Sequence, residues 1–84
     1  MKLVYFSWIR EKLGTAEENV ALPEQVNTVG DLLCWLATRS EAFAKVLEHD
    51  KVIRVAIDHV HVHDHAAAID GAQEIALFPP MTGG

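Results

Sequence analysis

The sequence of 84 residues has little cysteine, few basic residues and no long apolar run. Its one cysteine, Cys34, cannot form a disulfide within the chain, which is typical of a reducing cytoplasmic location. Seven lysines and arginines stand against 12 aspartates and glutamates, a formal net charge of −5. Because the basic residues are scattered, nucleic acid is not an expected partner. No apolar run reaches the ~18 residues of a membrane span, so we expect no membrane partner.

The small size of the chain limits what it can do alone. Half of the residues are apolar and 23% are charged, which is the composition of a folded protein and not of a disordered one. A chain of this length supports a single domain with one modest hydrophobic core. It has no room for a nucleotide-binding domain, a lid and a substrate pocket together. A self-sufficient enzyme is therefore disfavoured.

The first 23 residues predict two paired strands. Residues 3–8 are largely apolar at both alternating sets of positions, which predicts a strand buried on both faces and central in its sheet. Alternation returns over residues 18–22 and stops at Pro23. A turn over residues 10–14, ending at Gly14, would make these two strands an antiparallel pair.

A helix is the clearest element of the middle of the chain. Thr28 precedes Asp31 by three residues, which resembles a capping box with aspartate in place of glutamate. Cys34 lies off the centre of the apolar stripe and is interpreted as a small, half-buried hydrophobe. A weaker helical turn is predicted around Phe43, Val46 and Leu47. The stripe that faces the sheet is formed by Val29, Leu32, Leu33 and Leu36.

The remaining chain alternates as strands again. Residues 53–57 and 60–62 predict a hairpin with a tight turn at Asp58 and His59. A further turn at residues 69–71 leads to a last strand over residues 74–78, which two prolines end. The predicted fold class is α+β, a mixed β-sheet with one main helix packed across it, over residues 1–80.

The last four residues, 81–84, are predicted to form a flexible tail that ends in two glycines. Pro79 and Pro80 restrict the backbone and hold the following chain extended, so the tail can reach at most ~13–14 Å. Glycine lets a backbone enter a narrow channel and present its terminal carboxylate. A frayed chain end is the simpler alternative.

A terminal carboxylate is a poor electrophile and must be activated before it reacts, for example as a mixed anhydride with AMP. The chain has no glycine-rich phosphate cradle and no Walker-type lysine, so the ATP chemistry is expected on a partner. We therefore expect no bound cofactor here. The chain would carry the acyl group and would not itself be the catalyst.

Four segments together resemble a known family: "IREKLGT", "TVGDLLCWLA", "VAIDHV" and the ending "ALFPPMTGG". They are similar to the small, sulfur-carrier subunits of molybdopterin synthases, a branch of the ubiquitin-like β-grasp family. Thiamin-type sulfur carriers share the two terminal glycines, but they tend to be shorter and lack the two prolines. The resemblance spans nearly the whole chain.

The resemblance implies a sulfur-carrying role in molybdenum cofactor biosynthesis. Gly84 would be adenylated by an E1-like, ATP-dependent enzyme and converted to a thiocarboxylate. Met81, Thr82 and Gly83 would insert into the large synthase subunit, which supplies the catalytic residues and receives the sulfur for a pyranopterin precursor. The family assembles as a heterotetramer of two small and two large subunits.

Several residues near the tail are candidates for partner binding. Phe6 lies in the doubly apolar first strand and is open to either a core or a contact interpretation. Phe78 is better placed as an anchor because a strand end beside an exposed tail is hard to bury. Arg10 is open to being a solvated charge or a contact. The full predicted partner-binding set is Phe6, Arg10, His61, Phe78, Pro79 and Pro80.

The segment "DHVHVHDH" departs from the family pattern. If His61, His63 and His65 continue one strand, they share a face and could converge on a transition metal, with His61 and His63 as weak candidates. A solvent-facing polar strand is the simpler interpretation. Protonation of all five histidines would move the charge from −5 to 0, so a second hypothesis is a partner affinity that changes between about pH 5.5 and 7.5.

Three functions therefore remain open. The first is the sulfur-carrier subunit of a molybdopterin synthase. The second is a ubiquitin-like protein modifier, or a carrier for tRNA or thiamin sulfur, on the same fold. The third is a metal-binding module based on the histidines.

Overall fold

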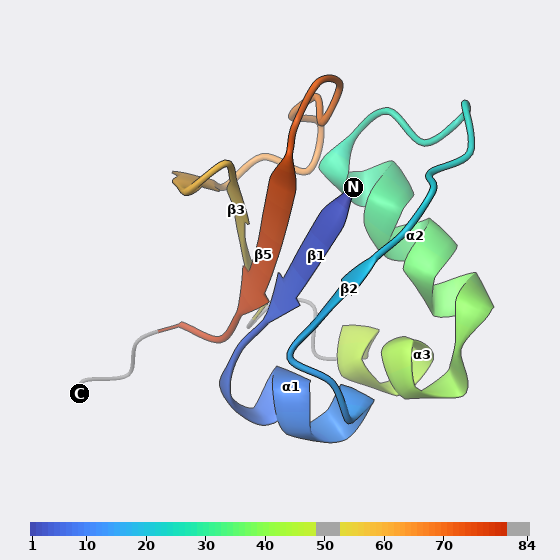
Figure 1. Ribbon diagram of the computed structural model, residues 1–84, viewed down its shortest axis with the longest axis vertical. Helices are drawn as coiled ribbons and strands as arrows, with labels where there is room; N and C mark the ends of the chain where they lie inside the picture. The colour runs from blue at the N-terminus through green and yellow to red at the C-terminus, as the bar shows by residue number, and fades with distance from the viewer. Residues whose placement is uncertain (49–52, 81–84) are drawn as a thin grey trace.

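The computed structural model describes residues 1–48 and 53–80, and within them a five-stranded mixed sheet with three helices (Figure 1). The strand order is β2-β1-β5-β3-β4. The elements in chain order are β1 (Lys2–Tyr5), α1 (Ser7–Leu13), β2 (Glu17–Asn19), α2 (Val29–Arg39), α3 (Glu41–Leu47), β3 (Arg54–Ile57), β4 (Val60–Val62) and β5 (Glu74–Phe78). The predicted α+β class, with a mixed sheet and one main helix, is confirmed.

The strand β5 occupies the middle of the sheet, although it is the last strand of the chain. It runs parallel to β1, with Leu3 opposite Ile75 and Tyr5 opposite Leu77. On its other side it pairs antiparallel with β3. Because β1 and β5 are parallel, the end of β1 and the end of β5 lie at the same edge of the domain, beside α1 (Figure 1).

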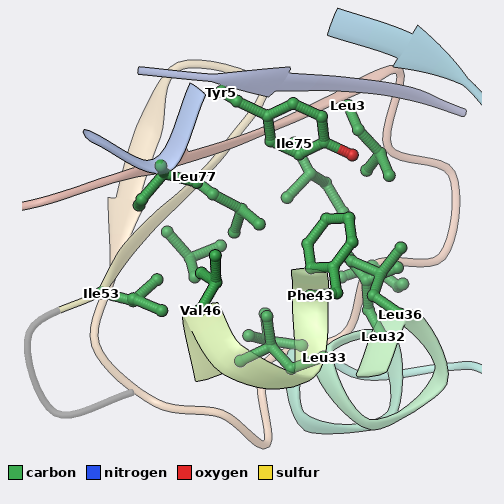
Figure 2. Close-up of a cluster of buried hydrophobic side chains, with 14 of the residues drawn as sticks. Leu3, Tyr5, Leu32, Leu33, Leu36, Phe43, Val46, Ile53, Ile75 and Leu77 are labelled. Carbon is green, nitrogen blue, oxygen red and sulfur yellow. The ribbon is translucent and has the colours of Figure 1, made fainter. Parts of the chain in front are cut away.

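The core lies between one face of the sheet and the helices α2 and α3 (Figure 2). The predicted apolar stripe of α2 is confirmed, since all four of its residues are buried. Each fully buried leucine or isoleucine contributes about 1.5–3 kcal/mol of hydrophobic stabilisation. None of the helices in the described residues is long and apolar enough to cross a membrane. The sheet supplies Leu3, Tyr5, Ile75 and Leu77, and the helices supply Leu32, Leu33, Leu36, Phe43 and Val46.

Side-chain caps set where α2 and α3 begin. The Thr28 hydroxyl accepts a hydrogen bond from the Asp31 N–H at 3.1 Å, and the Asp31 carboxylate accepts from the Thr28 N–H at 3.3 Å. The predicted capping box is therefore present. Ser40 ends α2 and caps α3, because its hydroxyl accepts from the N–H groups of Ala42 and Phe43. The weak helical turn expected around residues 43–47 is a full helix as a result.

The predicted first strand is wrong in its second half. The strand ends at Tyr5, and residues 7–13, expected as strand and turn, form α1. Ser7 makes the change of direction, since its φ of 55° is in the left-handed region. The helix then buries Ile9 and ends at Gly14, whose φ of 75° fits a glycine cap. The expected burial on both faces of β1 is also wrong, although its interior position in the sheet is correct.

The second strand is shorter and begins earlier than predicted. β2 spans Glu17–Asn19 in place of residues 18–22, and it pairs antiparallel with β1 as expected. Beyond it, the Val20 N–H donates to the Met1 carbonyl at 2.9 Å. Backbone pairing between the two segments therefore continues one residue beyond β2.

The β3–β4 hairpin has the predicted two-residue turn. Asp58 and His59 have φ values of 47° and 71°, as a type I′ turn requires at both central positions. The Asp58 carboxylate accepts hydrogen bonds from the N–H groups of Gln73 and Glu74, each at 2.9 Å. This turn therefore also fixes where β5 begins.

A polar chain ties the edge strand β2 to the core. The buried Tyr5 hydroxyl donates to Glu18 at 2.9 Å, and Glu18 also accepts from Arg39 of α2 at 3.1 Å. The Arg39 guanidinium lies 5.0 Å from the Trp35 ring centroid, a cation–π distance. Burial, together with the hydrogen bond to Glu18, raises the pKa of the Tyr5 hydroxyl well above its usual value.

We expect Leu33→Ala to lower the free energy of unfolding by about 2–5 kcal/mol, because it leaves a cavity between α2 and the sheet. Urea denaturation followed by tryptophan fluorescence measures the change. Val60→Ala is the control, since Val60 is 65% exposed and its loss should change stability by less than about 0.5 kcal/mol. Equal effects of the two substitutions would contradict the core described above.

The raised pKa of Tyr5 predicts a pH dependence of stability. The folded protein keeps the Tyr5 proton above about pH 10, where the unfolded chain loses it, so folding stability falls by about 1.4 kcal/mol per pH unit there. Below that pH the contribution is fully present. Tyr5→Phe removes the titrating group, so the variant should lose less stability than the wild type over this range. Parallel curves for the two proteins would show that Tyr5 is not responsible.

Candidate functional site

The end of β5 is where the predicted site begins. β5 ends at Phe78, and Pro79 and Pro80 follow, half-buried. The Phe6 N–H donates to the Leu77 carbonyl at 3.1 Å, which holds the β1–α1 junction against the end of β5. The residues predicted for activation and channel insertion, Met81, Thr82, Gly83 and Gly84, lie outside the described residues.

The sheet presents a second face, opposite the helices. Along β5, Ile75 and Leu77 are buried in the core, so the alternate residues Ala76 and Phe78 belong to the other face. The strand registers align one row across this outer sheet face. In order from β2 to β4 the row is Glu17, Val4, Ala76, Ala56 and His61. Three small apolar side chains fill its middle, which leaves the face flat there.

Aromatic rings gather on the outer sheet face at the end where the chain leaves β5. The His61 ring centroid lies 5.4 Å from that of Phe78 and 4.4 Å from that of His63. Phe6 is 46% exposed, a large fraction for a phenylalanine. We call Phe6, His61 and Phe78, with the adjoining Pro79 and Pro80, the exit surface.

The exit surface contains five of the six residues predicted for partner binding. The core interpretation of Phe6 is wrong, because the turn at Ser7 leaves its side chain outside. Arg10, the sixth, was expected in a turn but lies in α1, where it is exposed and its N–H donates to the Phe6 carbonyl at 3.3 Å. It therefore borders the same edge of the domain.

The opposite end of the outer sheet face has a different character. Lys2 contacts Glu17 at 3.4 Å and Glu74 at 3.8 Å, and the His59 ring lies 3.6 Å from Glu74. The two ion pairs of Lys2 are partly exposed and therefore contribute little to stability. Charged side chains thus occupy one end of the face and aromatic ones the end beside the tail.

Only part of the predicted histidine row exists. The rings of His61 and His63 lie next to each other. Because β4 ends at Val62, His65 does not continue the strand and lies in a turn. Asp64 forms that turn by accepting from the Ala66 N–H at 2.9 Å, and the His65 carbonyl accepts from the Gly30 N–H of α2. Within residues 1–48 and 53–80, no group of three or more His, Cys, Asp or Glu side chains is placed to hold a metal ion.

Sequence reasoning missed the flat centre of the outer sheet face. Val4, Ala56 and Ala76 look like ordinary strand residues, and only the register shows that they lie side by side. The alternation of residues 74–78 was a usable signal for Ala76, since it places that residue opposite the core.

Comparison with known proteins identifies the family. The model of the ThiS family matches residues 3–84 of this chain. The chain belongs to the ThiS family. Its resemblance to molybdopterin synthase sulfur-carrier subunits, expected from the sequence, is therefore confirmed at the level of family and relatives.

Two ThiS-family relatives are described as molybdopterin synthase sulfur carrier subunits. The Escherichia coli K12 protein is 34% identical over 84 residues, covering 100% of this chain and 99% of its own. The human protein is 26% identical over 86 residues, covering 100% of this chain and 93% of its own.

Solved structures agree on the fold. Haloferax volcanii SAMP1 aligns with a TM-score of 0.76 at 28% identity, covering 100% of this chain and 98% of that chain. A crystal structure of small archaeal modifier protein 1 from the same organism aligns with a TM-score of 0.72 at 26% identity, covering 95% of each chain. The ubiquitin-like β-grasp fold of this ThiS-family chain is thereby confirmed.

Proposed function

We propose that this chain is the sulfur-carrier subunit of a molybdopterin synthase, active in the cytoplasm as one of two small subunits in a heterotetramer. The observation that carries the proposal is the place where the ending "FPPMTGG" begins: the central strand β5 ends at Phe78, beside an exposed aromatic surface, and Pro79 and Pro80 follow. The full-length similarity to the E. coli subunit supports the same role.

The proposed chemistry takes place at the carboxylate of Gly84. An E1-like partner uses ATP to convert it to an acyl adenylate, with release of pyrophosphate. Sulfide from a sulfur source then attacks the acyl carbon, AMP leaves, and a thiocarboxylate remains, whose sulfur is a soft nucleophile on a tether. The large subunit positions that sulfur against the pyranopterin precursor and supplies the catalytic residues.

The exit surface is the proposed docking site for the large subunit and the activating enzyme. Phe6 and Phe78 are aromatic, and such residues dominate binding energy when a partner covers them. The hydrogen bond from the Phe6 N–H to the Leu77 carbonyl holds the backbone of Phe6 beside the end of β5, so little ordering is required on binding. The small residues Val4, Ala56 and Ala76 let a partner approach the sheet closely.

A second candidate function is that of a ubiquitin-like protein modifier. The likeness to H. volcanii small archaeal modifier protein 1 favours it. Activation of Gly84 is common to both functions, but the acceptor differs. A modifier would form an amide with a lysine amine of a target protein, whereas a sulfur carrier would release its sulfur and regain the carboxylate.

We expect the chain to gain a sulfur atom in place of one oxygen when it is incubated with ATP, a sulfur donor and its activating enzyme. Intact mass spectrometry, followed by fragmentation of the terminal peptide, locates the change at Gly84. Deletion of Gly84 should abolish the gain while changing the free energy of unfolding by less than about 0.5 kcal/mol, since the core of the described domain is built from residues 3–77.

The same preparation separates the two candidate functions. With the large subunit and the pyranopterin precursor, the thiocarboxylated chain should yield molybdopterin. If a competent enzyme produced no sulfur gain, both functions would be excluded. If sulfur were gained but no molybdopterin formed, and the chain became amide-linked to lysines of lysate proteins, only the modifier function would remain.

We expect Phe78→Ala to weaken binding to the large subunit at least about tenfold, because it removes the aromatic side chain at the base of the tail. Val60→Ala is the matched control: it also truncates an exposed apolar residue, but its place in β4 alternates with that of His61. Calorimetry measures both affinities, and thermal melting checks the fold. Equal affinities for Phe78→Ala and the wild type would exclude the exit surface as the docking site.

A further inference from the structure

Two histidine rings lie against each other at the end of β4. The centroids of His61 and His63 are 4.4 Å apart and the ring planes are inclined by 40°. His61 is opposite Ala56 in the β3–β4 register, so no bulky neighbour on β3 covers it. Both histidines are exposed to solvent. The pair is thus accessible, and its two rings lie side by side.

The nitrogens of the His61 and His63 rings are not engaged by a carboxylate, unlike that of His59. The His59 ring lies 3.6 Å from the Glu74 carboxylate, and the His65 backbone is fixed to the start of α2. In the part of the chain that the structure describes, the ring nitrogens of His61 and His63 form no hydrogen bond or ion pair. Their donor atoms are therefore available to an added ligand.

Imidazole nitrogens suit copper, nickel and zinc, whereas magnesium and calcium prefer oxygen ligands. Two nitrogens with water at the remaining positions fit the tetragonal geometry of Cu²⁺, which also binds nitrogen ligands most strongly among the divalent first-row metals. Because the two rings already lie side by side, a metal held by one imidazole can bind the other with little further loss of side-chain freedom. The net charge of −5 further favours a cation over an anion at this chain.

We propose that His61 and His63 form a two-histidine binding site for Cu²⁺, with Ni²⁺ and Zn²⁺ as weaker ligands. Metal binding at this site requires neither the tail nor a partner, so it can be tested apart from the sulfur-carrier function proposed above. It overlaps the exit surface at His61, whose ring also contacts Phe78.

The test is a Cu²⁺ titration of the full chain without an added histidine tag. Calorimetry should show one ion bound per chain, and electron paramagnetic resonance should show two imidazole nitrogens coupled to the copper. His61→Ala and His63→Ala should each weaken binding at least about tenfold. His59→Ala and His65→Ala are matched controls and should bind as the wild type does. Mg²⁺ should give no heat of binding.

A second measurement needs no variant. Titration with diamagnetic Zn²⁺ should shift the imidazole nitrogen resonances of His61 and His63 together and leave those of His59 and His65 in place. Shifts confined to other histidines, or equal weakening by the control substitutions, would overturn the assignment. Copper bound through a single nitrogen would overturn it as well.

Discussion

The structure depends on the central strand β5, one face of which packs in the core while the other belongs to the outer sheet face. In β5, Ile75 and Leu77 are fully buried against the helices, and Ala76 and Phe78 belong to the other face. Because a strand alternates strictly, each face of β5 is set independently of the other. Its parallel pairing with β1 then brings Phe6 and Phe78 to one edge of the domain. The strand β5 therefore contributes to both the core and the exit surface.

Local sequence patterns predicted the elements whose causes are local. The stripe of α2, its capping box, the hairpin turn at Asp58 and the last strand are each encoded within a few residues, and the structure has them as expected. The prediction of strand and turn for residues 7–13 was wrong because Trp8 and Ile9 continue the apolar run of the first strand. The chain turns from strand to helix at Ser7, whose left-handed backbone conformation is uncommon and is not indicated by the residue type.

The candidate site was predictable as a set of residues but not as a surface. Phe78 and the two prolines follow from the last strand, and the tail from its composition. That Phe6 is outside the core depends on the turn at Ser7, and the contact of His61 with Phe78 depends on the combined registers of β3, β4 and β5. Such registers are long-range properties, set by how the whole sheet buries its apolar face.

Stability and recognition are separated across the thickness of the sheet. The side chains that hold the domain together, including the chain from Tyr5 through Glu18 to Arg39, lie in the core or at the β2 edge. The exposed aromatic residues and the histidine pair contribute little to that packing, so a partner or a metal can contact them without unfolding the domain. In a chain of this size the core needs only the face of the sheet that the helices cover. The side chains of the other face are not needed for the core and are therefore available for binding.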